Sequence, residues 1–114
     1  MIQGIFNFPD QVKGTTFKAR DFEIGEDVET TLESVRMVFM KDGVATLEPT
    51  MTITSSTPPW LFTMEPVNAS DMDLEEGIHT YAIETIDENG EIGTEQYITG
   101  QINILPSPPF PVIP

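Results

Sequence analysis

Residues 77–105, GIHTYAIETIDENGEIGTEQYITGQINIL, contain the clearest strand pattern of this chain. His79, Tyr81 and Ile83 fall at every second position, which places them on one face of a strand because side chains alternate with a period of two. The Asn89-Gly90 pair favours the positive φ angles of a tight hairpin turn. The return strand is expected over 94–105, and one of its faces carries Ile98, Gly100, Ile102 and Ile104. This stretch therefore predicts an antiparallel β-hairpin.

A second hairpin is expected upstream, around Asp42-Gly43. Residues 34–41, SVRMVFMK, place Val35, Met37 and Phe39 on one face of a strand and apolar residues on the other as well, which is typical of a central strand. Asp-Gly favours a tight turn, so the chain should return through 45–47.

Three further segments have strand character. Residues 51–55 continue the meander, and in residues 60–64 Trp60, Phe62 and Met64 share one face. Residues 15–24 alternate with a phase jump between Ala19 and Phe22, which indicates a β-bulge or a strand bend. Between Pro66 and Gly77 the chain is expected to form no more than one helical turn.

About seven short strands with turn signals every 8 to 12 residues predict an all-β fold, an antiparallel Ig-like β-sandwich. Residues 1–13 are expected to be an N-terminal strand or arm, residues 14–105 the sandwich domain, and residues 106–114 a proline-rich C-terminal arm. The predicted core consists of Val35, Met37, Phe39, Trp60, Phe62, Tyr81, Ile102 and Ile104.

Composition and charge exclude several classes of function. The 114 residues include 5 basic and 19 acidic side chains, for a net charge of −14, and this acidity opposes binding to nucleic acid or anionic membranes. There is no cysteine and one histidine, so thiolate metal sites and cysteine nucleophiles are ruled out. With no apolar span and no signal-peptide pattern, we expect a soluble protein made without export, without cofactor and without enzymatic activity.

Two acidic clusters are candidates for calcium binding, around Asp71–Glu76 and around Asp87–Glu91. Gly90 comes only three residues after Asp87, so the spacing of an EF-hand loop is not met. These residues are better interpreted as solvated turns that maintain solubility and protect sheet edges.

The lone His79 has no second histidine or cysteine with which to share a metal, and a packed ring is the favoured interpretation. Ser70, His79 and Asp87 could be written as a catalytic triad, but no GxSxG elbow frames a serine. The only local basic cluster is Lys13, Lys18 and Arg20, which we expect to meet acidic neighbours.

Both ends of the chain carry apolar residues that are candidates for binding partner proteins. They are Ile2, Ile5, Phe6 and Phe8 at the N-terminal end and Phe110, Val112 and Ile113 at the C-terminal end. Extended arms of this kind can add a strand to a neighbour. At the N-terminal end the alternative is that these residues form the first strand of the sandwich itself. At the C-terminal end five prolines favour the arm, because they remove backbone donors.

Residues 14–106 resemble small Ig-like β-sandwich proteins of tailed bacteriophage virions. In that family the opening strand begins with G-D-T-F. Further along, an apolar residue and a glycine precede a strand with aromatic residues at alternate positions, and an acidic-Gly hairpin follows. The last strand ends in G-x-φ-x-φ, where φ is an apolar residue. The matching residues are Gly14, Thr16, Phe17, Leu74, Gly77, Tyr81, Asp87, Gly90, Gly100, Ile102 and Ile104. His79 stands where that family usually has its first aromatic residue, and the turn before the second strand is only loosely matched.

The resemblance implies a non-enzymatic virion component in symmetric, multiple copies, a capsid decoration or head-associated protein that packs onto larger virion proteins. A tail, neck or baseplate module is the first alternative. A carbohydrate- or peptide-binding sandwich is the second, and its stacking residues would be Trp60 and Tyr97.

Overall fold

The computed structural model describes residues 4–24, 29–90 and 98–106 of the chain. They form strands and one short 3₁₀ helix, η1 (Ala69–Met72). The strands are β1 (Gly4–Ile5), β2 (Gln11–Val12), β3 (Arg20–Ile24), β4 (Leu32–Lys41), β5 (Val44–Leu47), β6 (Met51–Ser55), β7 (Trp60–Met64), β8 (Gly77–Asp87) and β9 (Ile98–Leu105).

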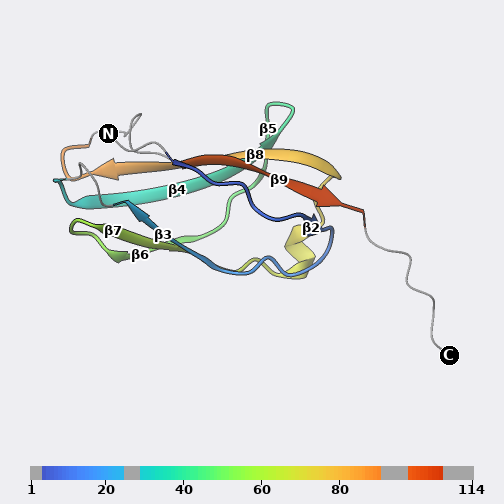
Figure 1. Ribbon diagram of the computed structural model, residues 1–114, viewed down its shortest axis with the longest axis horizontal. Helices are drawn as coiled ribbons and strands as arrows, with labels where there is room; N and C mark the ends of the chain where they lie inside the picture. Colours follow the sequence, from blue (N-terminus) through green and yellow to red (C-terminus); the bar gives the residue numbers. More distant parts are fainter. Residues whose placement is uncertain (1–3, 25–28, 91–97, 107–114) are drawn as a thin grey trace.

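The strands lie in two layers (Figure 1). The larger sheet has the order β1-β9-β8-β4-β5, with β2 also paired to β9, and the smaller sheet has the order β3-β7-β6. Irregular chain continues the smaller layer beyond its strands and includes η1. The two layers enclose one hydrophobic core between them.

This connectivity is that of an Ig-like β-sandwich. Strands β3, β7 and β6 take the places of strands B, E and D, while β4, β8 and β9 take those of C, F and G, and β5 is an added C′ strand. The prediction of an all-β Ig-like sandwich is therefore correct.

The predicted Asp42-Gly43 hairpin turn is present, whereas at Asn89-Gly90 only Gly90 has a positive φ angle, so the tight two-residue turn predicted there is not formed. Asp42 and Gly43 have φ angles of 53° and 80°, the two positive values of a type I′ turn, and they join β4 to β5. After β8, Gly90 has a φ angle of 74° and its amide donates to the carbonyl of Asp87. Strands β8 and β9 then pair antiparallel, with Tyr81 opposite Gly100.

The segment 15–24 is not the single bulged strand that the sequence predicted. Phe17 makes an isolated antiparallel bridge with Val67, Ala19 is exposed, and the strand proper begins at Arg20. The phase jump thus marks an interruption of the strand, and it changes the face on which the following side chains lie. Arg20 is half-buried, and it shares a face with the buried Phe22 and Ile24.

The described part of the N-terminal segment is a strand of the sandwich. Strands β1 and β2 both run parallel to β9. Between them the amide of Phe6 donates to the carbonyl of Thr99 and the amide of Phe8 to that of Gln101, both at 2.9 Å. Residues 4–12 therefore follow β9 for most of its length.

The core contains the residues predicted for it and several others. Seven of the eight predicted residues are buried, and Val35 is partly buried and packs against them. Aromatic rings from distant segments meet here: Phe8 lies 5.1 Å from Phe17 and 5.2 Å from Tyr81, measured between ring centroids. Of the two alternatives for the N-terminal segment, the strand is therefore the correct one, and it supplies part of the centre of the fold.

Candidate functional site

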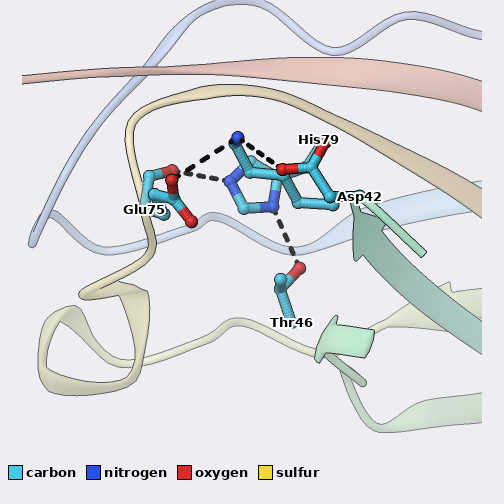
Figure 2. Close-up of polar contacts among 5 residues, drawn as sticks. Asp42, Thr46, Glu75 and His79 are labelled. Carbon is cyan, nitrogen blue, oxygen red and sulfur yellow. Dashed lines mark hydrogen bonds and ion pairs between the residues drawn. The ribbon is translucent and has the colours of Figure 1, made fainter. Parts of the chain in front are cut away.

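The inward face of β8 begins with a buried histidine. His79 is fully buried, with Tyr81 and Ile83 following on the same face. Its Nε2 lies 2.6 Å from the carbonyl oxygen of Glu75, and its Nδ1 lies 2.9 Å from the hydroxyl of Thr46. Figure 2 shows the ring held between these two residues.

These partners assign the tautomer of His79. A carbonyl oxygen only accepts hydrogen bonds, so Nε2 carries a proton and donates to Glu75, which leaves Nδ1 for the hydrogen bond with the hydroxyl of Thr46. Strand β8 corresponds to strand F of Ig domains. In those domains a tyrosine near the start of strand F donates to a backbone carbonyl a few residues upstream, the tyrosine corner. His79 makes the equivalent bond to the carbonyl of Glu75, four residues upstream. His79 therefore has a structural role, with an imidazole in place of a phenol.

Charged side chains lie close to this histidine, and Figure 2 shows Asp42 and Glu75 beside the ring. Lys41 Nζ lies 3.4 Å from the carboxylate of Asp42 and 3.6 Å from that of Glu75. The hydrogen bond and charge of Asp42, followed by the charge of Glu75, raise the pKa of Lys41 above its usual value. This cluster ties the β4–β5 turn to the segment before β8.

The residues of the conceivable triad do not come together. Asp87 ends β8, eight residues after His79, and its carboxylate accepts from the hydroxyl of Thr30 at 3.1 Å and from the amide of Asn89 at 2.9 Å. Asp87 is buried and stabilises the turn after β8. Thr46 and the carbonyl of Glu75 occupy the two ring nitrogens of His79, which pairs with no carboxylate in the described ranges of the chain.

The acidic clusters do not gather into a metal site in the part of the chain that the structure describes: no three acidic or histidine side chains there could hold one ion. Asp73 instead pairs with Lys13, and Glu75 with Lys41. Glu91 lies outside the described residues. The interpretation as solvated turns fits the exposed Asp73 and Glu75, but it is wrong for Asp87, which is buried and hydrogen-bonded.

Trp60 is not available for stacking on a ligand. Its side chain is fully buried, and its Nε1 donates to the carbonyl of Thr30 at 2.8 Å. The candidate role of Trp60 in carbohydrate or peptide binding is therefore wrong, whereas its predicted place in the core is where it lies. Tyr97, the other stacking candidate, falls outside the described residues.

Two of the candidate partner-binding residues are used inside the sandwich. Phe8 is buried, and Phe6 is partly buried and packs against the core. Their proposed role on a free arm is wrong, because the hydrogen bonds to β9 turn both rings inward. Ile5 lies in β1, and Ile2, Phe110, Val112 and Ile113 lie outside the described residues, so the C-terminal arm stays a prediction.

The three residues of the basic cluster differ in their surroundings. Lys13 lies 3.5 Å from Asp73, as the sequence led us to expect. No ion pair or hydrogen bond is made by the side chains of Lys18 and Arg20 to any described part of the chain, which corrects the expectation that all three meet acids. The guanidinium carbon of Arg20 instead lies 4.4 Å from the ring centre of Phe6 and 5.5 Å from that of Phe8.

A shallow hollow of about 180 Å³ opens beside this guanidinium. We call it the Arg20 hollow, and its lining residues are Phe8, Pro9, Gln11, Thr16, Phe17, Lys18, Ala19 and Arg20. Its floor is aromatic and its rim is cationic. The side-chain amide of Gln11, another lining residue, donates to the hydroxyl of Thr15 at 2.7 Å and to the carbonyl of Thr16 at 3.1 Å.

Sequence reasoning missed the Arg20 hollow although it singled out the basic cluster. Basic residues with nearby phenylalanines were visible in the sequence, but their meeting depends on the parallel pairing of the N-terminal segment with β9. No local pattern encodes that pairing.

The sequence matches no protein-family model, and no curated protein is significantly similar to it. A solved structure described as "Structures of Clostridium thermocellum CbhA fibronectin(III)-like modules" is similar to this chain in fold, with 13% sequence identity, a TM-score of 0.42 and 90% of each chain covered. The described residues contain no helix that is long and apolar enough to span a membrane.

Proposed function

We propose that this chain is a non-enzymatic structural protein of a tailed-bacteriophage virion, a capsid decoration or head-associated accessory protein that packs onto larger virion proteins. One observation supports the proposal that the protein is not an enzyme. His79 and Asp87, the residues considered for catalysis, are buried, and their side chains make structural hydrogen bonds. The resemblance of residues 14–106 to Ig-like virion proteins supports the virion part.

A protein of this kind acts through its surface. The Arg20 hollow, with a volume of about 180 Å³, falls below the roughly 300–1,000 Å³ of typical small-molecule sites. Two further hollows, of about 370 Å³ and 440 Å³, reach that range in volume but are open depressions rather than enclosed cavities. We place a tail, neck or baseplate module second, since it would use the same kind of surface. The buried position of Trp60 disfavours a carbohydrate-binding module.

The test is the composition of phage particles. Particles purified by density gradient from cells that produce the chain together with its neighbouring genes should contain it in a fixed ratio to the major capsid protein. Its absence from intact particles would contradict the proposal, and its presence in isolated tails but not in heads would favour the alternative.

A truncation separates attachment from folding. Deletion of residues 107–114 should leave the thermal midpoint nearly unchanged and reduce incorporation into particles, because the prolines of this segment cannot complete a sheet ladder while its apolar side chains can dock on a partner. A large fall in the midpoint with normal incorporation of the folded protein would show that the segment belongs to the sandwich.

A further inference from the structure

The positive charges of this chain are few, and most are neutralised by its own acids. Lys13 pairs with Asp73, Arg36 with Glu48 at 2.8 Å, and Lys41 with Asp42 and Glu75. Only Lys18 and Arg20, two of the five basic residues, have no such partner among the described residues, although acidic residues outnumber basic ones by 19 to 5. Both line the Arg20 hollow.

The guanidinium of Arg20 is held in place without its hydrogen-bond donors being used. Contact with the faces of Phe6 and Phe8 orients the guanidinium plane and removes part of its conformational freedom before any ligand arrives. Its N–H donors make no hydrogen bond within the described chain. A planar fork of free donors matches the two oxygens of a carboxylate.

The apolar residues that line the hollow determine which kind of group can bind next to the carboxylate. The buried Phe8 and Phe17 line it together with Pro9 and Ala19, and these residues offer apolar contact to a neighbouring side chain. A polyanion such as nucleic acid would bring many charges into the field of a −14 protein, and that repulsion grows with each phosphate. A ligand with a single carboxylate beside an apolar group makes the same contact with Arg20 as a polyanion would, and the acidic protein repels it less.

We propose that the Arg20 hollow is a docking site for an extended segment of a partner protein, which places one Glu or Asp carboxylate on the Arg20 guanidinium and an adjacent apolar side chain on the Phe8–Phe17 floor. Lys18 supplies a second, longer-range attraction at the rim. This site is independent of the proposed virion role, because it depends only on residues of the hollow.

The experiment follows the ¹⁵N resonances of the full chain, including the Arg20 Nε–H, during titration with the blocked peptide acetyl-Ala-Phe-Glu-Phe-Ala-amide. The matched control peptide has Gln in place of Glu. We expect saturable shifts at Arg20 and at the amides of residues 16–20 with the Glu peptide, and binding about tenfold weaker or undetectable with the Gln peptide, because a charge-assisted fork is lost.

Variants locate the interaction. Arg20→Gln should weaken binding of the Glu peptide about tenfold, whereas Lys13→Gln, at a cation already paired with Asp73, should change it less than twofold. Arg20→Glu should restore binding to a peptide with Lys in place of Glu, and this exchange separates a lost contact from a lost fold.

Several outcomes would overturn the proposal. They are equal binding of the Glu and Gln peptides, unchanged binding by Arg20→Gln, and saturation of the same shifts by inorganic phosphate at equal concentration, which would make the hollow a general anion site. Self-association in the absence of peptide that Arg20→Gln abolishes would replace the partner protein with a second copy of this chain.

Discussion

Individual buried polar residues determine how the ends of this sandwich are closed. Along β8, His79 and Asp87 lie at opposite ends of the inward face, with Tyr81 and Ile83 between them. No side-chain nitrogen or oxygen is buried without a hydrogen-bond partner in the described residues. Since an unpaired buried polar group is costly, these bonds specify which segment covers each end.

The first prediction concerns the corner made by His79. His79→Ala should reduce the free energy of unfolding by about 2–4 kcal/mol, because it opens a cavity in the core and leaves the carbonyl of Glu75 without its donor. The matched variant Thr46→Val removes only the bond to Nδ1 and should cost about 1 kcal/mol. Urea unfolding followed by Trp60 fluorescence measures both, and equal losses would argue against the corner.

A second prediction at this scale is a loss of stability at alkaline pH. Burial raises the pKa of Tyr81 to about 12, with a smaller opposing effect of the Arg20 charge, and its hydroxyl donates to the carbonyl of Phe6. Because the folded pKa lies above the unfolded value of about 10, the contribution is complete below pH 10 and is lost as the pH rises from 10 to 12. The total amounts to about 2–3 kcal/mol.

The check compares the natural chain with Tyr81→Phe between pH 9 and pH 11. The free energy of unfolding of Tyr81→Phe should fall by about 1 kcal/mol less over this interval, since its ring cannot ionise. Parallel curves for the two proteins would show that Tyr81 does not supply this pH dependence.

At the scale of the elements, the N-terminal segment and β9 approach each other closely at Gly100. The ideal Cβ position at Gly100 in β9 lies 1.8 Å from the carbonyl oxygen of Phe6 and 2.8 Å from Cε1 of Tyr81. The backbone of the N-terminal segment therefore occupies the space of a side chain, and a glycine is required here by contact rather than by a positive φ angle.

The third prediction follows from this contact. Gly100→Ala should push the chain around Phe6 away from β9, break the bond from Tyr81, and cost about 1–3 kcal/mol or more. Limited proteolysis should then cut the N-terminal segment faster than in the natural chain. Gln101→Ala, at an exposed side chain on the same strand, is the control and should leave the cleavage rate unchanged.

At the scale of the whole molecule, charge controls association. With a net charge of −14, two copies repel each other over a screening length of about 10 Å at 0.1 M salt. Three of the five basic residues fall within residues 13–20, whereas the 19 acidic residues are spread along the chain.

The fourth prediction is that self-association strengthens with salt. Screening reduces the repulsion between copies, so sedimentation equilibrium should show more oligomer at about 0.3 M than at about 0.02 M sodium chloride. A sharp loss of oligomer over the same range would mean that opposite charges hold the copies together, and Arg20→Gln would then identify the Arg20 hollow as the contact.

Sequence alone determined the elements that depend on neighbouring residues. The Asp42-Gly43 turn and the alternation through β4, β7 and β8 were readable because turn chemistry and a period of two act over a few positions. The Ig-like sandwich class followed from the number and spacing of the predicted strands.

Only the tertiary structure decided the surroundings of Phe6, Phe8 and Arg20. The N-terminal segment pairs in parallel with β9, some 94 residues further along the chain, and no local pattern carries that register. The same pairing brings Phe6 and Phe8 under Arg20, which the interruption before β3 has turned toward the gap between the sheets. The Arg20 hollow exists because contacts between distant segments are fixed by packing of the whole core, whereas propensities act within each segment separately.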